Sequence, residues 1–170
     1  DTSSKVNNNT FTSVSNVGLY FTNADLTIKD NGFTSTQTAI SGQSSTCAVD
    51  NNEITVSNYG VNLYDSECAI RNNTIQGDGY GNTGIYTNYP NPSYEIYDNE
   101  VFQFNSGIVS YGTVRISYNR IHDDNVGIYA FSGGNGNKTR GPGTDYITWN
   151  NLSTIIYVGI GIGQVNNIVV

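Results

Sequence analysis

The chain has 170 residues, of which 14 are acidic and seven are lysine or arginine, and its formal net charge is -7. Binding to a phosphate backbone requires clustered positive charge, so this composition excludes nucleic acid as a partner. The sequence contains no transmembrane segment and no cofactor motif, so we expect neither membrane insertion nor a bound cofactor.

Low charge, many Asn, Ser, Thr and Gly residues and 13 tyrosines are typical of a secreted or cell-surface protein. The chain has no methionine, even at position 1, and no signal peptide, which indicates a processed product or a fragment. Its length fits a single domain, residues 1–170.

From the first residues onward, one short motif recurs seven times: an aliphatic residue, two polar residues, an asparagine, any residue and an apolar residue. The clearest copies are CAVDNNEI at residues 47–54 and CAIRNNTI at residues 68–75. The repeated asparagines are Asn9, Asn31, Asn52, Asn73, Asn99, Asn119 and Asn150. Their first spacings are 22, 21, 21 and 26 residues, and a period near 21 indicates a solenoid of stacked coils.

Three apolar columns keep the register of these asparagines. The column three residues before each asparagine is Val6, Ile28, Val49, Ile70, Ile96, Ile116 and Ile147. The column two residues after it is Phe11, Phe33, Ile54, Ile75, Val101, Ile121 and Leu152. A third column follows a small residue and is Leu19, Ile40, Val61, Ile85, Ile108, Ile128 and Ile160. The pattern predicts short strands of period two that face these side chains inward and are separated by sharp corners.

Two small or polar columns are assigned to the corners. We expect the asparagine to turn the first corner, because Asn tolerates the left-handed conformation, and its amide to bond along the stack. The small residues before the third column are Gly18, Ala39, Gly60, Gly84, Gly107, Gly127 and Gly159. We expect them to let the second corner turn tightly.

This repeat resembles the short repeats of the right-handed parallel β-helix, the pectin-lyase-like superfamily, over residues 6–170. The resemblance implies an all-β, single-stranded right-handed solenoid of about seven coils with an asparagine ladder. Polysaccharide lyases, hydrolases and epimerases, phage tailspikes, adhesins and surface fibres share this fold, so it assigns no function. The Asn-Thr-Asp and Gly-His-Gly, Asp-Pro-His and Arg-X-Pro-X-X-Arg motifs of its enzymes are missing.

The two cysteines, Cys47 and Cys68, occupy the same column in consecutive coils. Coils stack about 4.8 Å apart, which lies within the Cα range of a disulfide. Two reduced core thiols are the alternative, since Leu26 and Val114 fill this column elsewhere. With two cysteines and one histidine, we expect no metal site.

Four Asn-X-Ser/Thr triplets begin at Asn8, Asn72, Asn137 and Asn151. They match the acceptor pattern for N-glycosylation, although such triplets also arise by chance in this composition. Asn137, in a glycine-rich loop, is the best candidate.

Insertions interrupt the repeat at residues 76–82, 88–94 and 130–145, and the last two are expected to form one wall of a groove. Nearby, Tyr86 and Tyr129 face outward in the column of Tyr20, with Val109 between them. Outward rings stack on sugars, but tyrosine is also a common exposed strand residue.

The candidate catalytic residues are His122, Asp123, Asp124 and, in the long loop, Arg140 with Lys138. Acid–base chemistry on a polysaccharide needs paired carboxylates or a base helped by a cation. The two aspartates adjoin each other and the two basic residues lie beyond the next strand, so we interpret Asp123 and Asp124 as ordinary turn residues.

Residues 165–170 begin an eighth coil, and no amphipathic helix caps either end. Open strand edges invite association. Either a larger protein has been trimmed, or copies stack end to end. We therefore expect an extracellular structural or adhesive unit of a fibre. The alternatives are a carbohydrate-active enzyme and a non-catalytic module that binds a glycan.

Overall fold

A computed structural model describes residues 3–88, 94–112, 114–131, 145–163 and 168–169, and their regular elements are all strands. None of the described residues forms a helix that would reach across a membrane. Strand pairing divides the strands into two parallel sheets, here called sheet A and sheet B.

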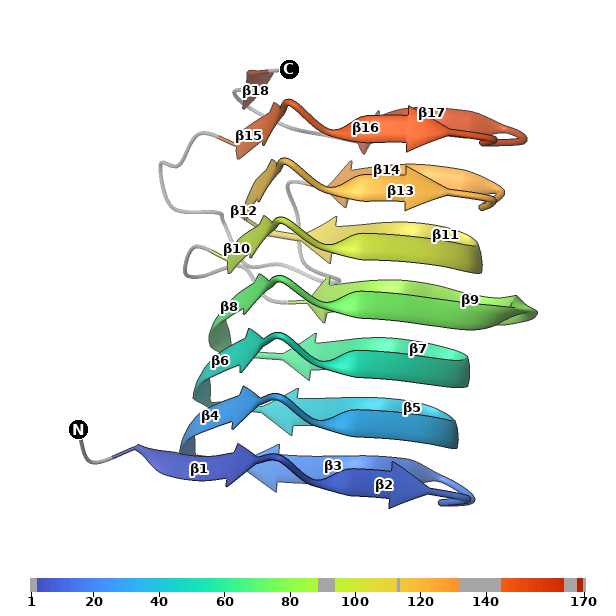
Figure 1. The fold of residues 1–170 in the computed structure, drawn as a ribbon. Helices are drawn as coiled ribbons and strands as arrows, with labels where there is room; N and C mark the ends of the chain where they lie inside the picture. Colours follow the sequence, from blue (N-terminus) through green and yellow to red (C-terminus); the bar gives the residue numbers. More distant parts are fainter. Residues whose placement is uncertain (1–2, 89–93, 113, 132–144, 164–167, 170) are drawn as a thin grey trace.

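Sheet A has eight strands, which pair in chain order. They are β1 (Ser4–Asn7), β4 (Asp25–Lys29), β6 (Thr46–Asp50), β8 (Glu67–Arg71), β10 (Tyr94–Tyr97), β12 (Val114–Ser117), β15 (Asp145–Thr148) and β18 (Ile168–Val169). Each begins a new coil directly above the previous one, as Figure 1 shows. The predicted all-β parallel solenoid is therefore confirmed.

Sheet B contains the other ten strands. Its strands are β2 (Thr10–Thr12), β3 (Val17–Thr22), β5 (Gly32–Gln43), β7 (Glu53–Tyr64), β9 (Thr74–Asn88), β11 (Glu100–Tyr111), β13 (Arg120–His122), β14 (Val126–Phe131), β16 (Asn151–Ser153) and β17 (Val158–Gly163). In Figure 1 the sheet folds back at the right-hand edge. We call β2, β13, β16 and the first halves of the long strands the front wall, and β3, β14, β17 and the second halves the back wall.

The fold-back lies within continuous strands in the middle coils, which differs from the sharp glycine corner predicted from sequence. Gly84 lies inside β9, and its φ is not positive. A Cβ at Gly84 would lie 2.3 Å from Val101 Cγ1 and 2.8 Å from the carbonyl oxygen of Gly107 in the next coil. Gly60, Gly107 and Gly127 are crowded in the same way, so most of this column is kept small by close contact between coils rather than by a tight turn.

The core is a narrow stack of aliphatic side chains between the sheets. Ile28, Val49, Ile70, Ile96 and Ile116 of sheet A are fully buried, and each lies beside its counterpart one coil away. Burying one such side chain contributes about 1.5–3 kcal/mol. Since every coil adds the same set, stability accumulates coil by coil.

Between sheet A and the front wall lies the asparagine corner, where the predicted ladder is present. The Asn73 Oδ1 atom accepts hydrogen bonds from the backbone N–H and the Nδ2 of Asn52, both at 2.9 Å. Its own Nδ2 reaches the carbonyl oxygens of Val49 and Arg71 and the Oδ1 of Asn99. Equivalent links join every consecutive pair of ladder asparagines from Asn9 to Asn150.

The ladder asparagines do not themselves adopt the left-handed conformation, so that part of the prediction is wrong. Positive φ falls instead on the residue before each of them. These residues are Asn8, Asp30, Asn51, Asn72, Asp98, Tyr118 and Trp149. The backbone reverses there, and the following asparagine is left free to point inward and bond along the stack.

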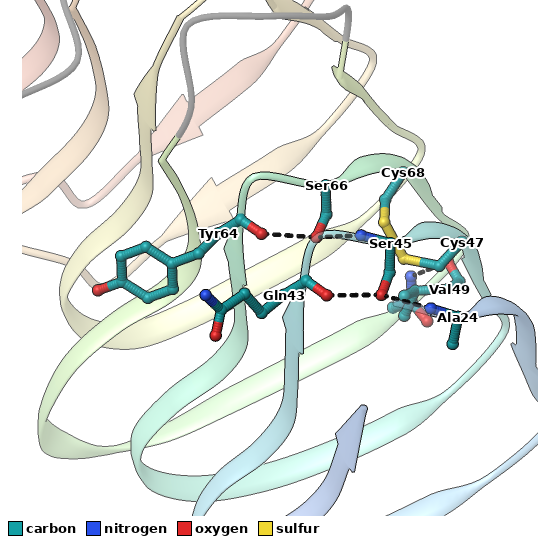
Figure 2. Close-up of a disulfide and its surroundings, with 9 residues drawn as sticks. Ala24, Gln43, Ser45, Cys47, Val49, Tyr64, Ser66 and Cys68 are labelled. Atoms are coloured by element: carbon teal, nitrogen blue, oxygen red, sulfur yellow. Dashed lines mark hydrogen bonds between the residues drawn. A yellow bond between two sulfur atoms is a disulfide. The ribbon is translucent and has the colours of Figure 1, made fainter. Parts of the chain in front are cut away.

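A second corner, where the back wall returns to sheet A, carries serine instead (Figure 2). The Ser45 Oγ accepts the backbone N–H of Ala24 at 3.1 Å and donates to the carbonyl oxygen of Gln43 at 2.7 Å. Ser66 Oγ likewise accepts from the Ser45 N–H. Two residues further on, Cys47 and Cys68 are joined by a disulfide with a Cα–Cα distance of 4.5 Å. The serine corner is therefore crosslinked covalently as well as by hydrogen bonds.

Candidate ligand-binding surface

The back wall carries six aromatic side chains on neighbouring coils, which we call the aromatic strip. They are Tyr59, Tyr64, Tyr86, Tyr111, Tyr129 and Phe131. Strand pairing places Tyr86 beside Val109 and Val109 beside Tyr129 in one outward column. Tyr64, Asn88, Tyr111 and Phe131 form the next outward column.

Tyr86 is the centre of the strip. Its ring centroid lies 5.9 Å from that of Tyr59, 5.7 Å from that of Tyr64 and 5.8 Å from that of Tyr111. These tilted and edge-on arrangements lie within the range that aromatic pairs prefer. One half-buried ring therefore connects three consecutive coils.

The strip continues upward through Phe131. This ring stacks on Tyr111 with centroids 4.6 Å apart and planes 2° from parallel, and it lies 4.2 Å from the Tyr129 ring. In the next coil, Gly161 occupies the position above Tyr129, and a Cβ there would lie 2.3 Å from the Tyr129 ring. The missing side chain gives Tyr129 room to lie against the backbone of β17.

The strip is polar at its hydroxyl groups but uncharged. Burial raises the pKa of the Tyr86 phenol to about 12, with smaller contributions from Tyr64 and Tyr111. Burial also raises the pKa of Tyr59. Asn88 Nδ2 donates a hydrogen bond to the Tyr86 hydroxyl at 3.2 Å. The surface thus combines ring faces with neutral hydroxyl and amide groups.

Sequence reasoning identified Tyr86 and Tyr129 but missed the other four rings of the strip. Tyr111 and Phe131 lie in the adjacent outward column, two residues beyond Val109 and Tyr129. A period-two reading of β11 and β14 would have found them. Tyr20 shares the Tyr86 column, is 60% exposed, and contacts no other ring among the described residues.

The front wall carries a separate polar cluster around His122. His122 Nδ1 lies 2.8 Å from Asp123 Oδ2, and Nε2 lies 3.2 Å from Glu100 Oε1. The ring stacks on Phe102 at 4.8 Å, and Arg120 forms an ion pair with Glu100. Because a carboxylate faces each ring nitrogen, only the protonated imidazole can donate to both.

Glu100 was not among the catalytic candidates, and it reaches His122 because the two residues lie on paired strands of adjacent coils. The hydrogen bond from His122 lowers the pKa of Asp123. Arg140 and Lys138 lie outside the described residues. The structure therefore brings His122 and Asp123 together with Glu100 on the front wall.

Asp124 points away from this cluster into the core and is fully buried. Its Oδ1 accepts the backbone N–H of Phe104 at 2.6 Å, while Oδ2 has no hydrogen-bond partner. Burial raises its pKa to about 7, against the opposing effect of the Phe104 bond. The exposed turn residue is Asp123, which has φ of 59°, whereas Asp124 differs from the prediction by facing inward.

The remaining candidate positions lie elsewhere on the coils. Asn8, Asn72 and Asn151 are exposed, and Asn72 Nδ2 donates to Asp50 at 3.0 Å. Asn137 and most of the predicted groove segments, residues 89–93 and 132–144, lie outside the described residues. Within the described ranges, no three His, Cys, Asp or Glu side chains cluster in a way that would hold a metal ion.

A shallow hollow of about 290 Å³ lies on sheet A beside the disulfide. Its lining residues are Thr46, Cys47, Glu67, Cys68, Ala69 and Glu95. The two glutamates give it acidic character, but it contains none of the aromatic rings described above.

Residues 1–142 match the family described as the right handed beta helix region. The chain belongs to this family, in agreement with the resemblance inferred from its repeats. No curated protein and no solved structure matches the chain.

Proposed function

We propose that the protein is a non-catalytic module that binds a neutral glycan along the aromatic strip. The observation that carries this proposal is the continuous contact of Tyr86 with Tyr59, Tyr64 and Tyr111. Aromatic rings offer a large rigid apolar surface, and tyrosine adds a hydroxyl for hydrogen bonding. A pyranose ring presents the complementary combination of C–H faces and hydroxyls.

The shape and charge of the surface support an uncharged, extended ligand. The strip runs along the stack over several coils rather than lining an enclosed pocket, which is the usual site for a small molecule. The chain has a net charge of -7, so an anionic polysaccharide would be repelled. The ligand class is therefore a neutral polysaccharide chain.

The test is affinity electrophoresis through gels that contain neutral polysaccharides, followed by calorimetry with the best of them. Replacing Tyr86 by Ala should weaken binding about tenfold, which corresponds to about 1.4 kcal/mol. Tyr129→Ala should have a smaller effect, because Tyr129 has one ring partner within the strip. Tyr86→Phe, which keeps the ring, should retain most of the affinity.

The matched control is Tyr20→Ala, which removes an exposed ring from the same column but outside the strip. Equal effects of Tyr20→Ala and Tyr86→Ala would contradict the proposal. Release of reducing sugar by the wild type, lost in His122→Ala, would instead favour a carbohydrate-active enzyme that uses the front-wall cluster.

A second candidate is an extracellular building block that associates end to end. It is favoured by Ile156 and Tyr157, which are 66% and 77% exposed beside β17. A disulfide between Cys47 and Cys68 would be favoured by an oxidising location. Sedimentation at increasing concentration tests it: concentration-dependent growth that Ile156→Ser and Tyr157→Ser reduce would support it, and a constant monomer would contradict it.

A further inference from the structure

The asparagine corner changes character in its upper coils. In the lower coils, its left-handed position is held by Asn or Asp, residue types that adopt positive φ with little strain. In the next two coils the same position is held by Tyr118, with φ of 57°, and Trp149, with φ of 54°. A bulky side chain in this conformation is a genuine outlier and costs about 1–2 kcal/mol.

Burial of the two side chains in the core does not offset this conformational strain. Tyr118 is 55% exposed and Trp149 is 73% exposed, so both rings lie largely in water. Their polar counterparts make better local contacts: Asn51 Nδ2 donates to Asp30 Oδ1 at 2.6 Å. Backbone strain that the fold does not require is most often found at functional sites.

The two rings form a single platform. Their centroids are 5.0 Å apart and their planes are 22° from parallel, so the rings overlap along the stack axis. Ser117 and Thr148, which immediately precede them and pair across β12 and β15, carry hydroxyl groups. On the outer face of the same two strands, the Arg115 guanidinium lies 5.0 Å above the Tyr146 ring.

We propose that Tyr118 and Trp149 form a second stacking site for a neutral saccharide, at the asparagine corner. The proposal shares its ligand class with the function proposed above but uses different residues. Exposed stacked rings bordered by hydroxyls suit a sugar, whose rings stack and whose hydroxyls accept and donate hydrogen bonds. Below the rings, Asp98 and Asn72 continue the same column and supply a carboxylate and an amide along the path of a longer chain.

The platform and the aromatic strip are on opposite sides of the coil. The corner between β15 and β16 lies at the front in Figure 1, whereas β14 and the second half of β11 run behind. A glycan chain along one surface therefore leaves the other free, and a protein with both surfaces would crosslink two chains.

Trp149 is the only tryptophan of the chain, so its fluorescence reports directly on the platform. The experiment is a titration of the whole protein with neutral hexasaccharides of glucose, mannose and xylose. We expect a saturable change in Trp149 emission with at least one of them. Tyr118→Asn should weaken it about tenfold, whereas Tyr86→Ala should leave its midpoint unchanged.

Trp149→Asn provides a second readout. Since it places a residue suited to positive φ at the corner, it should raise the melting temperature by about 2–4 °C while abolishing calorimetric binding at the platform. Lower stability of this variant would overturn the inference that the aromatic residue is strained there.

The two glycan proposals fail differently. No emission change with any hexasaccharide overturns the platform, even if Tyr86→Ala still weakens retention in polysaccharide gels. A response to apolar peptides but not to saccharides also overturns it. Loss of the Trp149 response in Tyr86→Ala would mean a single site on the back wall and would overturn the second site.

Discussion

The two corners that flank sheet A both turn the chain and link neighbouring coils by hydrogen bonds, but they use different side chains. Both place a left-handed residue first and a hydrogen-bonding residue second, as in Asn51 with Asn52 and Ser44 with Ser45. An asparagine amide accepts from one coil and donates to another, whereas the single proton of the Ser45 hydroxyl goes to its own coil at Gln43. The asparagine corner thus forms a continuous ladder, and the serine corner forms isolated links reinforced by a disulfide.

The largest effect should come from breaking the ladder at its centre. In Asn73→Leu, the Asn52 N–H and the carbonyl oxygens of Val49 and Arg71 lose their Asn73 partner. At about 1–3 kcal/mol for each unsatisfied group, partly relieved by water, unfolding should become easier by about 3–5 kcal/mol. Urea unfolding measures this.

Asn72→Gly is the control for the ladder variant. It changes the neighbouring corner residue, which has φ of 56°, to one that adopts this conformation freely. It should have little effect on stability. A similar loss in both variants would mean that the ladder amides contribute nothing special.

The next largest loss of stability should follow from removing the disulfide at the serine corner. Replacing both Cys47 and Cys68 by Val keeps apolar side chains in a column that holds Leu26 and Val114 elsewhere. Opening a 21-residue crosslink should lower the free energy of unfolding by about 3 kcal/mol. An unchanged unfolding midpoint, or no effect of a reducing agent on the wild type, would contradict this.

The third prediction concerns Asp124, which bonds to the neighbouring coil as a ladder residue does but carries an ionisable group. Burial raises its pKa in the folded protein to about 7, well above the 3.8 of a solvent-exposed aspartate. The protonated form is therefore favoured by folding, and its contribution to stability is complete below the unfolded pKa and is lost as pH rises through about 7.

We expect the wild type to lose about 2–3 kcal/mol of stability between about pH 5 and about pH 8 from this group. Asp124→Asn keeps the acceptor for Phe104 N–H and should flatten that dependence. Asp123→Asn is the control: the pKa of exposed Asp123 is lowered, so its contribution runs in the opposite direction. A pH profile that Asp124→Asn leaves unchanged would contradict the assignment.

The smallest effect should follow from Ser45→Ala. This change removes the side-chain acceptor of the Ala24 N–H. One coil earlier, Ala24 itself stands at the position of Ser45, so the corner already accommodates an alanine there. We expect a loss of about 1 kcal/mol, several times less than for Asn73→Leu. A loss as large as that of Asn73→Leu would show that the two corners contribute equally.

The sequence predicted the fold because period-two alternation and a constant coil length determine which side chains face inward. It did not locate the left-handed residue, since Asn51 and Asn52 are the same residue type and only the backbone distinguishes them. It also predicted that Gly84 is small because the chain turns there, whereas the reason is its close contact with the next coil.

The candidate surface was harder to predict, because ring contacts depend on side-chain direction across coils. Tyr86 was identified from its column, but its contact with Tyr111 crosses to another column. The candidate partners of His122 named from sequence lie in its own coil. The structure adds the carboxylate of Glu100, which comes from the coil below. Neighbours one coil apart, about 20 residues away in sequence, are the ones to compare.

The hydrogen bonds between the ladder asparagines all run in the same direction, and these asparagines are evenly spaced over several coils. The chain can therefore be shortened or lengthened without loss of register only by whole coils. In every link the earlier coil donates its N–H and the later coil accepts through Oδ1. Asn31, Asn52 and Asn73 are spaced evenly, so removing residues 52–72 would present Asn73 to Asn31 in an identical register. A deletion of one residue would instead turn a whole strand inside out. We expect this protein to tolerate the loss or duplication of an entire coil far better than the loss of a single amino acid. Insertions and deletions that preserve the fold should therefore come in multiples of one coil.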